Sequence, residues 1–106
     1  MQLTKNFTLA EMLRSQTATR LNIQEQFNPP LAIINNLKAL CENVLQPLRN
    51  KLKKSIFVSS GYRCPRVNRV IGGATNSQHL TGLAADFTAT DYTTEELYQY
   101  IKTSNI

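Results

Sequence analysis

The sequence has little of several residue types, and each shortage excludes a class of protein. Its 106 residues include one histidine and two cysteines. Two cysteines are too few for the disulfide framework of a small secreted domain, and Cys41 lies in an apolar helical pattern, so we expect Cys41 and Cys64 to be free thiols. No apolar run approaches the roughly 20 residues that a transmembrane helix requires, so we expect no membrane partner.

Other functional patterns are missing as well. The first seven residues lack the apolar stretch of a secretory signal, so the localisation stays open. Gly72 and Gly73 lack the spaced glycines and the following lysine of a phosphate-binding loop. Basic residues exceed acidic ones by 12 to 7, which suits an anionic polymer. Because no base-reading or aromatic side chains interleave with the basic cluster over residues 49–54, we interpret it as a solvated helix end and expect no nucleic-acid partner.

Two capping boxes and one long periodic stretch predict the helices. Thr8–Glu11 and Thr93–Glu96 each place a threonine three residues before a glutamate, which is typical of a helix start. Between them, apolar residues recur at helical spacing over residues 31–53, so this stretch is expected to be the main packing helix. Pro47 lies inside it and should bend or split the helix near Leu45, because proline has no backbone N–H to donate.

Two short stretches predict strands. Residues 55–60 are rich in β-branched and aromatic side chains and favour a buried strand. Residues 83–89 alternate between apolar and small or polar side chains, with Leu83 and Phe87 on the same face. We therefore predict an α+β fold in which N-terminal helices pack on a small, mainly antiparallel sheet that carries the functional site.

The candidate site is the stretch Ser77–Asp86, which contains the only histidine and an aspartate seven residues after it. A zinc ion needs nitrogen, sulfur or carboxylate donors within about 2.0–2.3 Å. In one extended strand His79 and Asp86 would lie about 23 Å apart, so they can share an ion only if the chain turns between them. Gly82 permits such a turn, because glycine adopts positive φ without steric cost.

The motif residues also carry a family resemblance. The stretch reads S-Q-H-L-T-G-L-A-A-D, and Ser59-Ser60-Gly61-Tyr62-Arg63, Asn68 and Gly72-Gly73 precede it. The pattern S-x-H-x-x-G-x-A-x-D fixes five positions over ten residues, and S-G-Y-R adds four more. Together they resemble the zinc D-Ala-D-Ala carboxypeptidase family, which includes related dipeptidases and endolysin peptidases. The resemblance runs from Phe7 to about Phe87.

The resemblance implies a role for each motif residue. It implies a Hedgehog-like fold in which His79 and Asp86 are zinc ligands. Arg63 would bind the substrate and stabilise the transition state, and its planar guanidinium suits a carboxylate or an oxyanion. Ser77 would bind substrate or support the turn. The implied enzyme is a zinc metallocarboxypeptidase that hydrolyses peptidoglycan stem peptides in the cell wall.

One zinc ligand is missing from this picture. In the family, the third ligand is a histidine on a later strand, with a carboxylate general base shortly before it. This sequence has no second histidine, and Asp91, Glu95 and Glu96 fit a turn and a first helical turn better than a ligand shell. We therefore expect residues 1–106 to be a single peptidase-like domain that is incomplete at its C-terminus. We expect this chain alone to bind zinc weakly and to hydrolyse little or nothing.

Other interpretations stay open. A non-catalytic cell-wall or peptide-binding module on the same fold would keep its peptide affinity after metal removal. A small basic nucleic-acid binder would lose affinity steeply with salt and ignore a chelator. Cys64 could be a soft zinc ligand, although its context favours a structural thiol. His79 could also be only a hydrogen-bonded turn histidine. The oligomeric state is not predicted.

Overall fold

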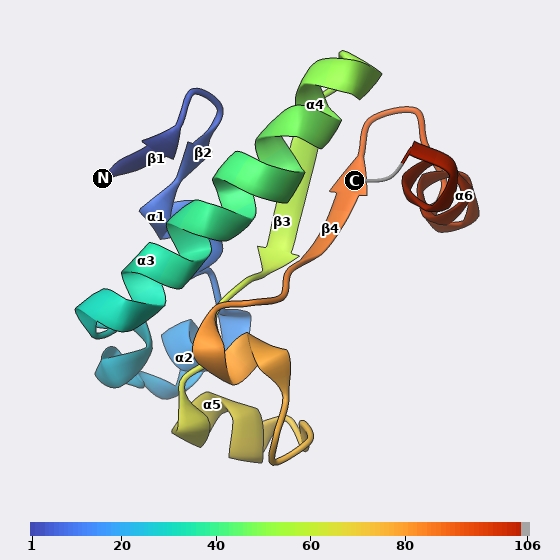
Figure 1. Cartoon of the computed structure of the whole chain (residues 1–106). Helices are drawn as coiled ribbons and strands as arrows, with labels where there is room; N and C mark the ends of the chain where they lie inside the picture. Colours follow the sequence, from blue (N-terminus) through green and yellow to red (C-terminus); the bar gives the residue numbers. More distant parts are fainter. Residues whose placement is uncertain (105–106) are drawn as a thin grey trace.

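The computed structural model describes residues 1–104, and its N-terminal part is a small hairpin followed by short helices (Figure 1). Strands β1 and β2 pair antiparallel. Thr8 caps the first helix as predicted, because its hydroxyl accepts from the Glu11 N–H while the Glu11 carboxylate accepts from the Thr8 N–H. The elements are β1 Gln2–Thr4, β2 Phe7–Thr8, α1 Leu9–Met12, α2 Gln16–Leu21 and the 3₁₀ helix η1 Gln24–Phe27.

A long helix follows, and it contains a wider turn at the predicted position. The helix comprises α3 Leu31–Leu40, the π-helical segment η2 Cys41–Leu45 and α4 Gln46–Leu52. The Gln46 N–H donates to the carbonyl of Cys41, five residues earlier. The wider turn gives the ring of Pro47 room beside the preceding turn, which is how a helix can continue past a proline. The helix continues past Pro47 rather than splitting, and the π-helical segment that ends at Leu45 lies where the sequence predicted a bend or split.

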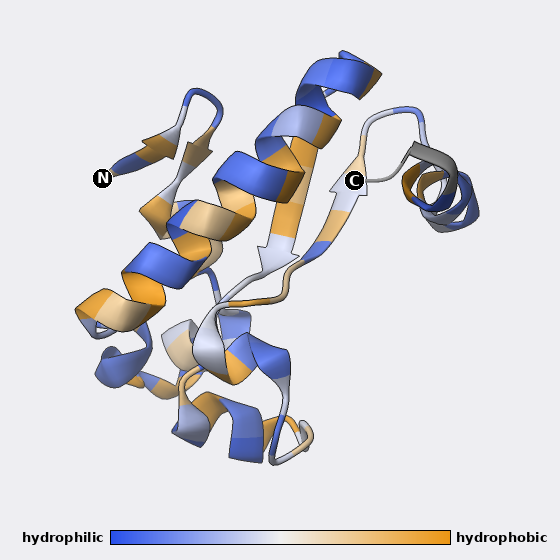
Figure 2. Cartoon of the chain, viewed as in Figure 1, coloured by the Kyte–Doolittle hydropathy of each residue, from blue (hydrophilic) through white to orange (hydrophobic). Residues whose placement is uncertain are grey.

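One face of this long helix builds the core. Its buried residues are Leu37, Cys41, Leu45, Leu48 and Leu52. Leu31, at the start of the same predicted stripe, is 70% exposed and lies outside the core, whereas Ile33 in the same turn packs against it. Figure 2 shows hydrophobic and hydrophilic residues alternating along the helix, and behind it lies strand β3 (Ile56–Ser60), which is hydrophobic in its first part.

The second sheet carries the candidate site. It pairs β3 Ile56–Ser60 antiparallel with β4 Asp86–Ala89, and Ser60 lies opposite Asp86. Because side chains alternate across a strand, Val58 is buried while Phe57 is 54% exposed. The predicted strand over residues 55–60 is confirmed from Ile56 to Ser60, but only one of its faces is buried. The predicted strand over residues 83–89 begins only at Asp86, and Leu83 is half exposed.

The connection between β3 and β4 holds two short helices, and a longer helix follows β4. These are α5 Pro65–Val70, the 3₁₀ helix η3 Gln78–Thr81, and α6 Thr94–Ser104 beyond the end of β4 (Figure 1). The second capping box is confirmed, since the Thr93 N–H donates to Glu96 and the Glu96 N–H donates to Thr93. None of the helices within residues 1–104 is long and apolar enough to cross a bilayer.

The predicted α+β class is confirmed, with one correction to the sheet. The strands form two separate two-stranded antiparallel sheets rather than one sheet. The hairpin of β1 and β2 uses residues whose sequence gave no alternating pattern long enough to predict a strand, because the two strands have only three and two residues.

Candidate metal centre and adjoining cleft

His79 and Asp86, which the sequence proposed as a metal pair, lie side by side. His79 is on η3 with a side chain only 12% exposed, and Asp86 opens β4 with a side chain 65% exposed. Nε2 of His79 is 3.5 Å from Oδ2 of Asp86. The turn between them is at Gly82 as predicted, with φ of 74°.

The other ring nitrogen of His79 is bound to the backbone. Nδ1 lies 2.6 Å from the carbonyl oxygen of Gly61. A carbonyl oxygen can only accept, so Nδ1 carries the proton that it donates. In the neutral ring, Nε2 then has the free lone pair, and it faces the Asp86 carboxylate. A backbone carbonyl is one of the usual partners by which proteins orient a histidine that ligates a metal through its other ring nitrogen.

The distance between the two donors fits zinc. Two donors on one tetrahedral zinc ion, each at about 2.0–2.1 Å, lie about 3.3–3.5 Å from each other, which matches the separation of Nε2 and Oδ2. A protonated histidine paired with the carboxylate is the alternative that the same distance allows. Within residues 1–104, no group of three histidine, cysteine, aspartate or glutamate side chains could hold a metal ion. A third ligand is therefore not located in the described part of the chain.

The acidic residues considered as substitutes have other partners. Asp91 accepts from Lys54 at 2.9 Å, Glu95 accepts from the Gln99 side chain at 3.1 Å, and Glu96 caps α6. Cys64 is buried with 1% exposure and Cys41 is fully buried, and both are free thiols as predicted. Burial raises the pKa of Cys41 to about 11, with the charges of Glu11 and Glu42 acting in the same direction. Cys41 therefore stays a neutral core side chain at ordinary pH.

Arg63 and Ser77 surround His79 from the other side. The Arg63 N–H donates to the carbonyl of His79 at 3.0 Å. The Ser77 hydroxyl accepts both from the His79 N–H and from the Arg63 guanidinium, each at 3.2 Å. Nε of Arg63 is buried and has no hydrogen-bond partner in the described structure. These contacts show Ser77 supporting the histidine turn, while the substrate roles of Ser77 and Arg63 stay predictions.

Gln26 also contributes to the site, and the sequence analysis missed it. Its side chain is fully buried and makes three hydrogen bonds. It donates to the carbonyls of Leu13 and Tyr62 and accepts from the Cys64 N–H at 2.8–2.9 Å. It therefore holds the chain on both sides of Arg63. A glutamine inside the polar run Gln24-Glu25-Gln26 gives no pattern that distinguishes a buried residue from exposed ones.

Asn68 and Gly73 hold the loop that leads to His79. The Asn68 amide donates to the carbonyl of Ala74 at 2.9 Å. A Cβ atom on Gly73 would meet Oδ1 of Asn68 at 2.1 Å, so only glycine fits there without a shift. In the sequence both residues appeared only as parts of the family motif.

We call Gln26, Gly61, Arg63 and Ser77 the histidine frame.

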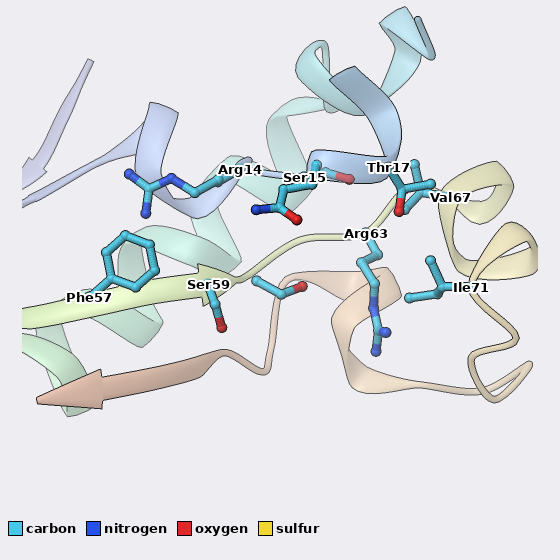
Figure 3. A pocket seen from close by; sticks show the side chains of 10 residues that line it. Arg14, Ser15, Thr17, Phe57, Ser59, Arg63, Val67 and Ile71 are labelled. Carbon is cyan, nitrogen blue, oxygen red and sulfur yellow. The ribbon is translucent and has the colours of Figure 1, made fainter. Parts of the chain in front are cut away.

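A cleft adjoins the histidine frame. It has a volume of about 280 Å³, near the lower end of the roughly 300–1,000 Å³ usual for ligand pockets. Figure 3 shows Arg63 and Ile71 at one end and Arg14 over the ring of Phe57 at the other. His79 and Asp86 do not line the cleft but lie beside it. Ser59, which lines the cleft, donates its hydroxyl to the carbonyl of Asp86 at 3.2 Å.

Comparison with known proteins places the chain in a family. The family described as Peptidase M15 matches residues 5–106, nearly the whole chain. The chain belongs to the Peptidase M15 family. The predicted resemblance to zinc D-Ala-D-Ala carboxypeptidases is thereby confirmed. A comparison with curated proteins and one with solved structures gave no match. Membership of Peptidase M15 indicates a hydrolase of the metallopeptidase type.

Proposed function

We propose that this protein acts as a zinc-dependent peptidase of the D-Ala-D-Ala carboxypeptidase type on peptidoglycan stem peptides. The observation that carries the proposal is the orientation of His79. Its Nδ1 donates to the Gly61 carbonyl, so Nε2 faces Asp86 at a distance that suits two donors on one zinc ion. Membership of the Peptidase M15 family supports the reaction class.

Each residue of the site has a part in this proposal. When bound, zinc would polarise the scissile carbonyl and lower the pKa of a water molecule. His79 and Asp86 would hold the metal. Arg63 would bind the substrate carboxylate or stabilise the developing oxyanion through its terminal guanidinium N–H groups, because its Nε is buried. Ser77 would keep both His79 and Arg63 in place through its two hydrogen bonds.

Zinc binding by matched variants tests the metal assignment. We expect residues 1–106 to bind zinc more weakly than a complete four-ligand structural site, whose apparent binding free energy is about 10–16 kcal/mol at neutral pH. Competition with a chromogenic chelator should show that His79→Ala and Asp86→Asn each abolish this binding. Asp91→Asn is the control, because Asp91 lies outside the site in a left-handed turn that asparagine tolerates. Equal zinc affinity in all four proteins would contradict the assignment.

A second candidate is a non-catalytic peptide-binding module on the same fold. It is favoured by the absence of a third ligand among residues 1–104. Release of D-alanine from a stem pentapeptide and zinc affinity, measured together, separate the two candidates. Hydrolysis that a chelator abolishes and zinc restores supports the peptidase. Peptide binding by a chain that has no zinc affinity, without hydrolysis at any zinc concentration, would favour the binding module.

A further inference from the structure

The cleft beside Arg63 has an uneven charge. Its ten lining residues include two arginines, Arg14 and Arg63, and no aspartate or glutamate. Glu11 lies one turn before Arg14, but its carboxylate accepts from Thr8, and the described structure has no ion pair between Glu11 and Arg14. Two cations on one concave surface attract anions and raise their local concentration.

Arg14 is positioned but has donors to spare. Its Nη1 donates to the carbonyl of Val58 at 2.7 Å, and its guanidinium carbon lies 4.6 Å from the centre of the Phe57 ring. These contacts fix the plane of the guanidinium over an exposed aromatic ring. Only one of its five N–H groups has a partner within residues 1–104, and a fixed guanidinium with free donors suits a bidentate carboxylate.

The other end of the cleft also holds an arginine, Arg63. Nε of Arg63 is buried without a partner among the described residues, and Val67 and Ile71 supply apolar surface next to it. Figure 3 shows Ser15 and Ser59 between the two arginine ends. Ser59 and Ser60 lead directly into Gly61, whose carbonyl holds His79. The cleft therefore runs along β3 toward the candidate metal pair.

We propose that this cleft binds a short peptide with two anionic groups, and that Arg14 determines specificity by holding a carboxylate at the end opposite Arg63. The inference rests on the proposed function in taking the ligand to be a peptide. It also requires the peptide to have an acidic residue besides the group that Arg63 holds, a requirement that does not follow from membership of the family. The two separated guanidinium groups favour a dianionic peptide over a neutral one.

Two peptides that differ by one charge test the proposal. The probes are acetyl-Glu-D-Ala-D-Ala and acetyl-Gln-D-Ala-D-Ala, and calorimetry measures their affinities for residues 1–106 at low salt with a chelator present. The natural chain should bind the glutamate peptide about tenfold more tightly, since a hydrogen bond to a charged group contributes at least that much. Arg14→Gln should remove the preference while affinity for the glutamine peptide changes little.

Two further variants separate a local effect from a general one. Arg20→Gln removes an equal charge from an exposed position that does not line the cleft, and it should keep the preference. Arg14→Lys keeps the charge but loses the fork of donors, so part of the preference should remain. Thermal unfolding checks that each variant is folded. If Arg14→Gln is unfolded, Arg14→Lys carries the test, together with a fall of the preference as salt is added to the natural chain.

Several results would overturn the proposal. They are equal affinity of the natural chain for both peptides, equal loss of preference in Arg14→Gln and Arg20→Gln, no measurable binding of either peptide, and tighter binding of a short single-stranded DNA. Because the assay contains no free metal, its outcome is independent of zinc binding. A charge preference without zinc affinity would support the cleft assignment and contradict the proposed peptidase. Zinc affinity without a charge preference would support the peptidase and contradict the cleft assignment.

Discussion

His79 and Asp86 approach each other to 3.5 Å, but the structure around the first differs from the structure around the second. The His79 ring is held through Gly61, and its backbone is held by Ser77 and Arg63. Asp86 has a side chain that is 65% exposed, and its strand β4 has β3 as its paired strand. After β4, α6 has only Leu97 buried among residues 94–102.

This difference shows which part of the site is organised in advance. The histidine frame rests on the buried hydrogen bonds of Gln26 and the part-buried ones of Gly61, Arg63 and Ser77, so Nε2 has a defined direction before any ligand arrives. The Asp86 carboxylate can rotate in solvent, and the exposed face around it is the side from which a further ligand or a substrate can approach. We call β4 and α6 the aspartate side, and the predictions below test whether the two sides differ as described.

Gln26→Leu should produce the largest loss of stability. It keeps the size of the side chain but leaves the Leu13 and Tyr62 carbonyls and the Cys64 N–H without partners. At about 1–3 kcal/mol for each buried unsatisfied group, we expect the free energy of unfolding to fall by roughly 3 kcal/mol or more. Urea denaturation measures it. Gln24→Leu on the same helix η1 is the exposed control, with an expected change within about 0.5 kcal/mol. Equal effects would show that the histidine frame has no buried support from Gln26.

Gly61→Ala should have a smaller effect on stability but a direct effect on the site. A Cβ atom there would meet the carbonyl oxygen of Met12 at 2.5 Å, and backbone cannot move aside easily. We expect a loss of about 1–3 kcal/mol and weaker zinc binding, because the acceptor of His79 Nδ1 must shift. Gly72→Asn is the control, since that position has open space and a φ of 74° that asparagine adopts readily. Unchanged zinc affinity in Gly61→Ala would contradict the role of this carbonyl.

Titration of Cys41 should report on the buried core beneath the long helix. Burial raises the pKa of Cys41 from 9.0 to about 11, so the neutral thiol is favoured in the folded state. Its contribution to stability is full below pH 9 and is lost as the pH rises toward 11. We expect a loss of roughly 1 kcal/mol between pH 8 and pH 10. The difference in unfolding free energy between the natural chain and Cys41→Ala, followed against pH, isolates this contribution. A difference that does not vary with pH would contradict it.

Thr93→Ala should have the smallest and most local effect. The hydrogen bonds of Thr93 lower the pKa of Glu96, so the cap stabilises the folded chain at neutral pH and is lost as the pH falls through the folded pKa of Glu96. Loss of a threonine cap costs about 1 kcal/mol. Hydrogen exchange should quicken in α6 and stay unchanged in α3. Equal quickening in both helices would show that the aspartate side is not the independent part that its exposure indicates.

Much of the fold was predictable because local signals and tertiary structure agree. The capping boxes at Thr8 and Thr93, the long apolar stripe and the disturbance near Pro47 all depend on neighbours within one or two turns. The single-sheet prediction was wrong because strand pairing depends on residues far apart in the sequence. The hairpin of β1 and β2 was missed because a strand of two residues carries no period.

The site was predictable only in part. The motif singled out His79, Asp86 and Arg63, which the fold brings together while their roles stay predictions. The turn at Gly82 could be expected from its glycine. The acceptor of His79 Nδ1 could not be predicted, since a backbone carbonyl has no sequence signature. Arg14 was missed for a similar reason, because only the approach of α1 to β3 brings it to the cleft. Contacts between distant segments therefore account for most of what the sequence analysis lacked.

The ring nitrogens of His79 offer the most direct test of the central claim. The chain has one histidine, so nitrogen-15 spectra of its imidazole need no assignment. In the neutral ring of the metal-free protein, we expect the proton on Nδ1. Added zinc should shift Nε2 in the natural chain and leave it unshifted in Asp86→Asn. A neutral ring protonated on Nε2, or a zinc shift that survives in Asp86→Asn, would contradict the claim that the two side chains form one metal site.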